Sequence, residues 1–199
     1  YNPAYYGLST SNSIKLSFAL ANRNPNSPLL YIQGTEGRYL SLDLYKRHVR
    51  FMWNLGGSTA IITHPLEIQT RDPKYDDAWY HVDVNRTLNT ASLLVRRMNN
   101  YGELVPSNVV MAASDLLHTR FYQSTTDHLY LGGYPSETGN QEVQLAAGLN
   151  VVVHKLEVDN KPLGLWNFEK SEGKCGGAML GAQESTSSSV ARHFNGLGY

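Results

Sequence analysis

Hydrophobic and polar residues alternate with a period of two along much of the chain. Ile14, Leu16 and Phe18 fall on one face of an extended segment. Lys15 and Ser17 fall on the opposite face. This period is typical of an antiparallel strand that packs one face on a core and leaves the other in solvent. The pattern predicts strands over residues 14–20, 29–33, 39–44, 49–55, 59–64, 80–85, 91–97, 128–132 and 151–158.

Turn-forming residues separate the predicted strands. Residues 56–57 are Gly-Gly, residues 99–100 are Asn-Asn, and residues 159–160 are Asp-Asn. Such pairs favour tight connections between strands. Residues 111–118 give one weak helical pattern, with a short turn between strands as the alternative. Many short strands and no long amphipathic helix predict an all-β fold, a sandwich of antiparallel sheets.

The composition and the periodicity of the sequence change after residue 168. Residues 169–193 contain clusters of Gly and Ser with little apolar periodicity, which predicts a linker or tail. Residues 194–199 become strand-like again. We therefore predict a domain over residues 1–168, a linker over 169–193, and the start of a following domain at 194–199.

Composition excludes several classes of partner. The chain has 199 residues with 17 basic and 17 acidic side chains, so its formal net charge is zero. We expect no nucleic-acid binding, because charge-driven binding would have to come from a local patch. No apolar run reaches the roughly 18 residues that a membrane-spanning helix needs, so we expect no membrane insertion. The chain begins at Tyr1 without an initiator Met, and we expect a processed piece of a longer chain.

Common catalytic motifs are missing from the sequence. It has seven histidines but no His-Glu-x-x-His, no Gly-x-Ser-x-Gly and no glycine-rich phosphate loop. Asp43 and Asp83 fall on predicted outward faces, and we interpret them as solvated surface groups. The single cysteine, Cys175, has no base nearby in the sequence to activate it. These observations predict a protein that is not an enzyme.

The densest basic stretch contains Lys46, Arg47, His48 and Arg50. Such residues at the end of a hairpin can bind a sulfated glycan, or they can keep a strand edge soluble and protected. The second interpretation is the more common one. The sequence leaves both open.

One glycosylation acceptor triplet is present, Asn85-Arg86-Thr87. Asn85 falls on the outward phase of its predicted strand, where a glycan can be accommodated. This predicts a glycosylation site at Asn85 and gives mild support for secretion.

Several segments resemble laminin G-like modules. Residues 128–135 read His-Leu-Tyr-Leu-Gly-Gly-Tyr-Pro, which is similar to a strand motif of these modules. Residues 38–57 resemble their hairpin, and residues 79–86 resemble their Trp-His-x-Val strand. The run Gly-Leu-Trp-Asn-Phe at residues 164–168 resembles the end of the first G-like module of laminin alpha chains.

The resemblance implies a fold, a function and partners. The fold is then a jelly-roll sandwich of two antiparallel sheets. The function is that of a non-catalytic adhesion module, secreted into the extracellular matrix of the basement membrane. The partners are laminin beta and gamma chains in a heterotrimer and integrin receptors at its tip. The alternative is a glycan-binding module that recognises heparan sulfate or the matriglycan of dystroglycan.

Two departures from the family pattern concern calcium and disulfides. The resemblance places a calcium site at the rim, but its two Asp positions hold Arg38 and Ser124 here. Calcium prefers several oxygen ligands that include carboxylates, so we predict no calcium and no other cofactor. The Leu55 carbonyl and Asp127 are the groups that could rescue such a site. The family's other cysteine positions are also substituted, which leaves Cys175 as a free thiol or bonded outside this chain.

Overall fold

We describe the protein from a computed structural model, and the structure describes residues 7–20, 25–69, 79–99, 101–135, 151–164, 178–180 and 192–194. Its elements are β1 (Gly7–Ser9), β2 (Ser11–Leu20), β3 (Ser27–Gln33), η1 (Thr35–Gly37), β4 (Tyr39–Tyr45), β5 (His48–Asn54), β6 (Ala60–Glu67), β7 (Trp79–Thr87), β8 (Thr90–Arg97), β9 (Val109–Ala113), β10 (Phe121–Gln123), β11 (Leu129–Leu131), β12 (Val151–Val158), β13 (Lys161–Pro162), β14 (Ala178–Leu180) and β15 (Arg192–Phe194).

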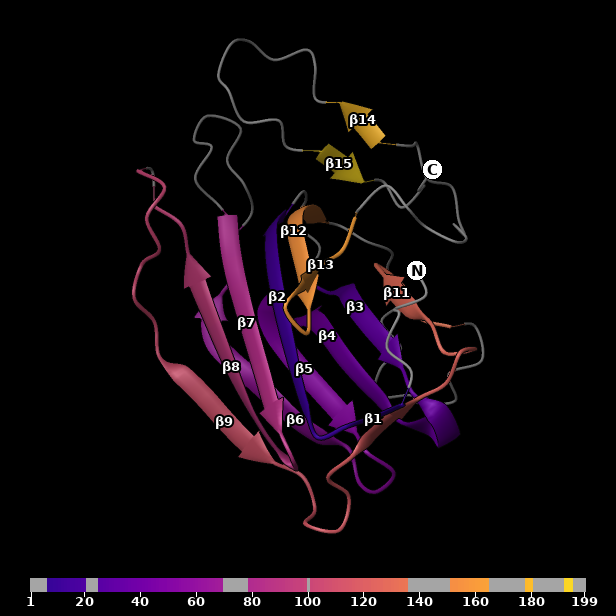
Figure 1. Cartoon of the computed structure of the whole chain (residues 1–199). Coiled ribbons are helices and arrows are strands. Elements are labelled where there is room, and N and C mark those ends of the chain that lie inside the picture. The colour runs from indigo at the N-terminus through magenta and orange to yellow at the C-terminus, as the bar shows by residue number, and fades with distance from the viewer. Residues whose placement is uncertain are drawn as a thin grey trace.

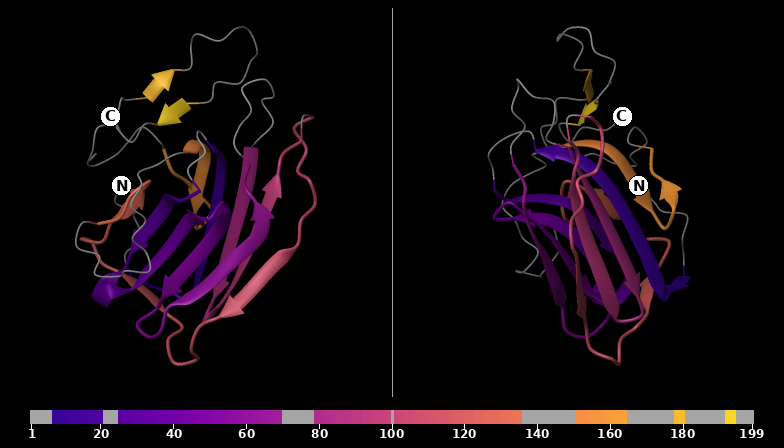
Figure 2. Two further views of the ribbon diagram at one scale, coloured as in Figure 1. Left: turned by 180° about the vertical axis from the view of Figure 1, so that it is seen from behind. Right: turned by 90° about the vertical axis from the view of Figure 1, so that its left-hand side faces the viewer.

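Two antiparallel sheets form the body of the fold (Figure 1). One sheet has five strands in the order β11-β3-β4-β5-β6, and the other has six in the order β13-β12-β2-β7-β8-β9. Figure 2 shows them as two facing layers. Two short pairs, β1 with β10 and β14 with β15, complete the described strands. The predicted sandwich of antiparallel sheets is therefore confirmed.

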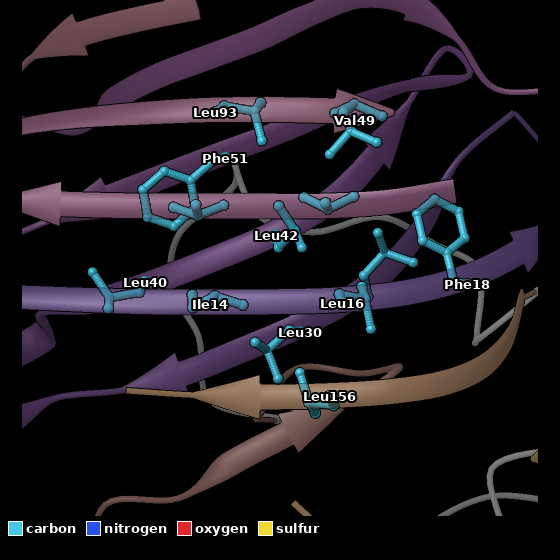
Figure 3. Close-up of a cluster of buried hydrophobic side chains, with 14 of the residues drawn as sticks. Ile14, Leu16, Phe18, Leu30, Leu40, Leu42, Val49, Phe51, Leu93 and Leu156 are labelled. Carbon is cyan, nitrogen blue, oxygen red and sulfur yellow. The ribbon is translucent and has the colours of Figure 1, made fainter. Parts of the chain in front are cut away.

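The core lies between the two layers, where the predicted inward faces meet (Figure 3). Ile14, Leu16 and Phe18 of β2 face Leu42 of β4 and Phe51 of β5. All five side chains are buried, as the alternation in their strands predicts. Burying an apolar side chain of this size contributes about 1.5–3 kcal/mol, so this shared face holds the layers together.

Two predictions about local structure are wrong. The weak helical pattern at 111–118 belongs instead to the edge strand β9 and the turns after it. Val110 and Ala112 pack against the core at a period of two, which a strand requires and a helix does not. The interpretation of Asp43 as a solvated group also fails, because both faces of β4 are buried.

The predicted linker and following domain lie mostly outside the described residues. Of residues 169–199, the structure describes only the strands β14 and β15, which pair antiparallel. Cys175 lies outside the described residues. The boundaries predicted at 168 and 193 remain predictions.

A buried arginine connects the loops at one end of the sandwich. The Arg86 guanidinium donates hydrogen bonds to the Asn12 side chain and to the carbonyl oxygens of Ser9, Leu88 and Thr119. Burial lowers the pKa of Arg86 to about 10, so the group still carries its charge at neutral pH. One cation thus fixes the turn after β1, the β7–β8 hairpin and the segment before β10.

A buried histidine makes stability depend on pH. His64 Nδ1 accepts the N–H of Leu66 at 3.1 Å, so Nε2 carries the proton and donates to the Asn108 carbonyl at 2.9 Å. Burial lowers the pKa of His64. The unfolded chain therefore binds a proton at a higher pH than the folded one, and the free energy of unfolding falls as the pH drops through 6.5.

We expect His64→Gln to reduce this pH dependence, because glutamine does not titrate. Urea unfolding of both proteins between pH 7.5 and pH 5 measures the slope. The variant retains a smaller slope, because burial also lowers the pKa of His81. Equal slopes for the two proteins would contradict the assigned role of His64.

Candidate functional site: the rim loops around Arg38

Arg38 joins two loops at the rim of the five-stranded sheet. It follows the short turn η1 and precedes β4. Its Nε donates to the Leu55 carbonyl at 3.0 Å, and its Nη1 donates to the Thr35 carbonyl at 3.2 Å. Nη1 also pairs with the carboxylate of Glu36. The guanidinium therefore lies between carbonyl oxygens from both sides of the rim.

Strand β10 approaches the same guanidinium. The Arg38 Cζ lies 4.8 Å from the centroid of the Tyr122 ring, within the range of a cation–π contact. This approach depends on Gly34, where a Cβ would lie 2.6 Å from the Phe121 ring and 2.7 Å from the Tyr122 carbonyl oxygen. Strand β10 and the loop at residue 34 can come this close only because residue 34 has no side chain.

Ser124 and Asp127 form a turn next to this cluster. Asp127 Oδ2 accepts the Ser124 backbone N–H at 2.6 Å, and the Ser124 carbonyl accepts the Asp127 N–H at 3.2 Å. Ser124 Oγ also shares a hydrogen bond with Thr126. The Asp127 side chain is buried, and its carboxylate stabilises its own turn.

The predicted glycan-binding stretch is not a set of free cations. Arg50 donates to Asp43 through Nε at 3.0 Å and through Nη2 at 2.7 Å. Arg47 donates to the Ile68 carbonyl and pairs with Glu67. The His48 Nδ1 lies 3.2 Å from the His64 carbonyl oxygen. Lys46 remains exposed, with its Nζ 5.2 Å from the Tyr45 ring centroid.

Known proteins share this architecture. Residues 20–161 match the model of a protein family that is described as "Laminin G domain". The chain belongs to the laminin G domain family. Laminin subunit alpha-1 of Homo sapiens is 24% identical over 193 residues, and that of Mus musculus is 23% identical over 192 residues. Each alignment covers 96% of this chain and 6% of the relative, so the chain spans a small part of those proteins.

Solved structures agree with the fold of this laminin G domain. The LG1-3 region of the laminin alpha2 chain has a TM-score of 0.69 at 20% identity, covering 87% of this chain and 31% of that chain. Mouse laminin alpha1 domains LG4-5 have a TM-score of 0.56 at 18% identity, covering 92% and 40%. The resemblance to G-like modules of laminin alpha chains and the jelly-roll sandwich are thereby confirmed.

The rim of this laminin G domain does not fit a calcium ion. The Leu55 carbonyl, a predicted rescuing ligand, already accepts a hydrogen bond from Arg38. The Asp127 carboxylate, the other rescuing group, accepts the Ser124 N–H. Within the described ranges, no group of three or more His, Cys, Asp or Glu side chains could hold a metal ion. The fixed cation of Arg38 thus bonds to the oxygen that a calcium ion would need.

We expect calcium to leave the stability of this domain unchanged. A site saturated at one hundred times its Kd would add about 2.7 kcal/mol, which raises the Tm of a protein of this size by roughly 5–10 °C. Thermal unfolding in millimolar calcium and in a chelator measures this difference. A calcium-dependent rise in Tm of several degrees would contradict the assignment.

The remaining predicted site residues have different environments. Asn85 is exposed on the outer face of β7, and its glycosylation remains a prediction. Asp83 is partly exposed and pairs with Arg96 at 2.6 Å, so it is not an isolated carboxylate. Among the described residues, no helix is long and apolar enough to cross a membrane.

Sequence reasoning missed Arg86. Its strand places Tyr80, Val82 and Val84 on the buried face, and Arg86 continues the same phase. The sequence could therefore have predicted a buried Arg86, because the alternation places this residue on the inward face. A charged side chain on that face requires buried polar partners.

Proposed function

We propose that this laminin G domain is a non-catalytic adhesion module of a laminin alpha chain, secreted into the basement membrane. In this proposal the chain assembles with laminin beta and gamma chains, and the module contributes to the integrin-binding tip of the heterotrimer. The observation that carries the proposal is the likeness to laminin subunit alpha-1 over 96% of the chain, together with the family match over residues 20–161.

The chemistry of the described side chains supports binding rather than catalysis. The carboxylates of Asp43 and Asp83 pair with arginines, and Asp127 accepts a backbone N–H. Each of these three carboxylates is therefore occupied by an internal partner, whereas a glycosidase holds two carboxyl groups on either side of the bond that it cleaves. A rigid sandwich that displays loops and sheet faces is instead suited to surface recognition.

A graft into a known laminin tests the proposal. The segment of human laminin alpha-1 that aligns with this chain is replaced by this chain, and in a matched control by an unrelated β-sandwich. The first graft is expected to be secreted with beta and gamma chains and to support cell adhesion, whereas the control loses adhesion. Equal loss of adhesion in both grafts would contradict the proposal.

The glycan-binding alternative receives less support at the predicted hairpin. Arg47, His48 and Arg50 all have protein partners, which lowers their capacity to bind a sulfate. Recognition of matriglycan through calcium is also disfavoured, because Arg38 holds the Leu55 carbonyl.

A further inference from the structure

Strand β9 is an open edge of the six-stranded sheet. It ends the strand order of that sheet, and Figures 1 and 2 show it at the outer border of the fold. Its register with β8 runs without a shift from Val109 to Ala113. Among the described residues, no backbone hydrogen bond joins the outer side of β9 to another segment. This side of the strand can therefore accept a further strand.

The backbone groups of three residues of β9 point to the open side. Ser114, directly after β9, donates its N–H to the carbonyl of Asn89, directly before β8, at 2.8 Å. Because backbone groups alternate in direction along a strand, every second residue back from Ser114 also faces β8. The residues between them, Val109, Met111 and Ala113, therefore direct their N–H and C=O groups away from the sheet.

The side chains of the same three residues are exposed on the outer face of the sheet. Val109 is 55% exposed and Met111 is 68% exposed. The strand reads Val-Val-Met-Ala-Ala, so it carries no charge and no proline. An exposed apolar strand with unpaired backbone groups is a template for pairing with another chain.

The other three edges of the two sheets differ from β9. Strand β6 contains Pro65 and Glu67, β11 has only three residues, and β13 consists of Lys161–Pro162. Charges, proline and short length keep an edge from pairing with another chain. Of these four edges, only β9 lacks such protection.

The sequence of β9 is complementary to itself in an antiparallel pair. A pair centred on Met111 places Val109 opposite Ala113 of a second copy, and Val110 opposite Ala112. Each larger valine side chain then meets a small alanine, and Met111 meets its own counterpart. In this register the residues whose backbone groups face outward lie opposite one another, so each such pair can exchange both of its N–H···O bonds.

We propose that this laminin G domain pairs with a second copy of itself through β9. The two six-stranded sheets then join into one continuous sheet across a two-fold axis at Met111. The chain has a formal net charge of zero, so no net charge opposes the contact. A two-fold contact closes on itself, and Lys161–Pro162 protects the opposite edge, so assembly stops at a dimer. The proposal does not depend on integrin binding.

Sedimentation velocity of the whole chain at about 100 μM tests the proposal, because this concentration populates a complex with a micromolar Kd. Met111→Lys places two positive charges opposite each other at the axis, where like charges repel. The control Leu117→Lys makes the same change at a residue after β9 that is 89% exposed. We expect a monomer–dimer equilibrium for the parent and the control, and a monomer for Met111→Lys.

A disulfide cross-link tests the register. Met111→Cys and the control Leu117→Cys are each made together with Cys175→Ser, so that each protein has one thiol. In a hydrogen-bonded antiparallel pair the Cα atoms lie about 5.5 Å apart, within the range that a disulfide spans. We expect mild oxidation to link the Met111→Cys variant into a covalent dimer and to leave the control largely monomeric.

Four results would overturn the proposal. They are a monomeric parent at about 100 μM, a dimer that persists in Met111→Lys, an equal loss of the dimer in Leu117→Lys, and equal cross-linking of the two cysteine variants. Species that grow beyond a dimer with concentration would contradict the closed two-fold contact. Thermal unfolding of each variant checks that its fold is intact, because both substituted side chains are exposed and we expect Tm to stay unchanged.

Discussion

Replacement of Arg86 by Met is expected to lower the free energy of unfolding by about 3–5 kcal/mol, the cost of removing one partner from a buried charged network. Methionine fills most of the volume but donates no hydrogen bonds. The carbonyl oxygens of Ser9, Leu88 and Thr119 would then lose a donor that they now share. The turn after β1, the β7–β8 hairpin and the segment before β10 would all lose the side chain that now joins them.

Urea unfolding at pH 7 measures this effect. Lys15→Met on the neighbouring strand β2 is the control, because it makes the same kind of replacement at an exposed position. We expect the control to change the free energy of unfolding by less than about 0.5 kcal/mol. A loss of less than about 1 kcal/mol for Arg86→Met would show that the guanidinium does not hold the loops.

Removal of Asp43 alone is expected to cost about 3–5 kcal/mol, because it leaves the Arg50 guanidinium in a largely buried site without its carboxylate. The Asp43 side chain is fully buried, and two hydrogen bonds join it to Arg50. Burial raises the pKa of Asp43, although Arg50 opposes that shift. The pair therefore carries a large desolvation cost, and its net contribution to stability is small.

Replacing both partners should recover most of the loss. The double variant Asp43→Leu with Arg50→Met removes both charges and keeps apolar volume, and such replacements of buried pairs are often neutral or stabilising. A double-mutant cycle by chemical unfolding compares Asp43→Leu, Arg50→Met and the double variant. If the two single losses simply add in the double variant, the pair does not act as a unit.

The alternation of the sequence was enough to predict the core. Leu42, Phe51 and Val82 lie on the predicted inward faces because an apolar side chain at every second position has only one face to bury. The residue-level motifs, such as residues 128–135, added the family, which alternation cannot supply. Together the alternation and the motifs predict the two-sheet sandwich.

The alternation of polar and apolar residues could not predict that the second face of a strand is also buried. Tyr39, Ser41 and Asp43 read as outward residues, yet all three are buried, with Tyr39 stacked on Tyr31. The pattern of one strand does not report what packs over its outer face. That information depends on long-range contacts.

The cross-strand alignment of polar residues on the outer face of the six-stranded sheet could not have been found from sequence either. Lys155, Ser17, His81 and Arg96 are far apart along the chain, and only the strand order and register bring them into line. The bulge at His154 is equally invisible in a pattern of polar residues. By contrast, the prediction that Arg38 stands in the place of a calcium ion rests on a single substitution in a recognised motif, and the structure adds the carbonyl partners of this side chain.

The most direct test of the proposed function is the affinity of an integrin ectodomain for a laminin heterotrimer that carries this chain. The comparison is a heterotrimer in which only residues 7–164 are replaced by an unrelated β-sandwich. We predict that the replacement weakens binding at least tenfold, equivalent to about 1.4 kcal/mol. Unchanged affinity, with both heterotrimers assembled and secreted, would contradict a role for this module in the integrin-binding tip.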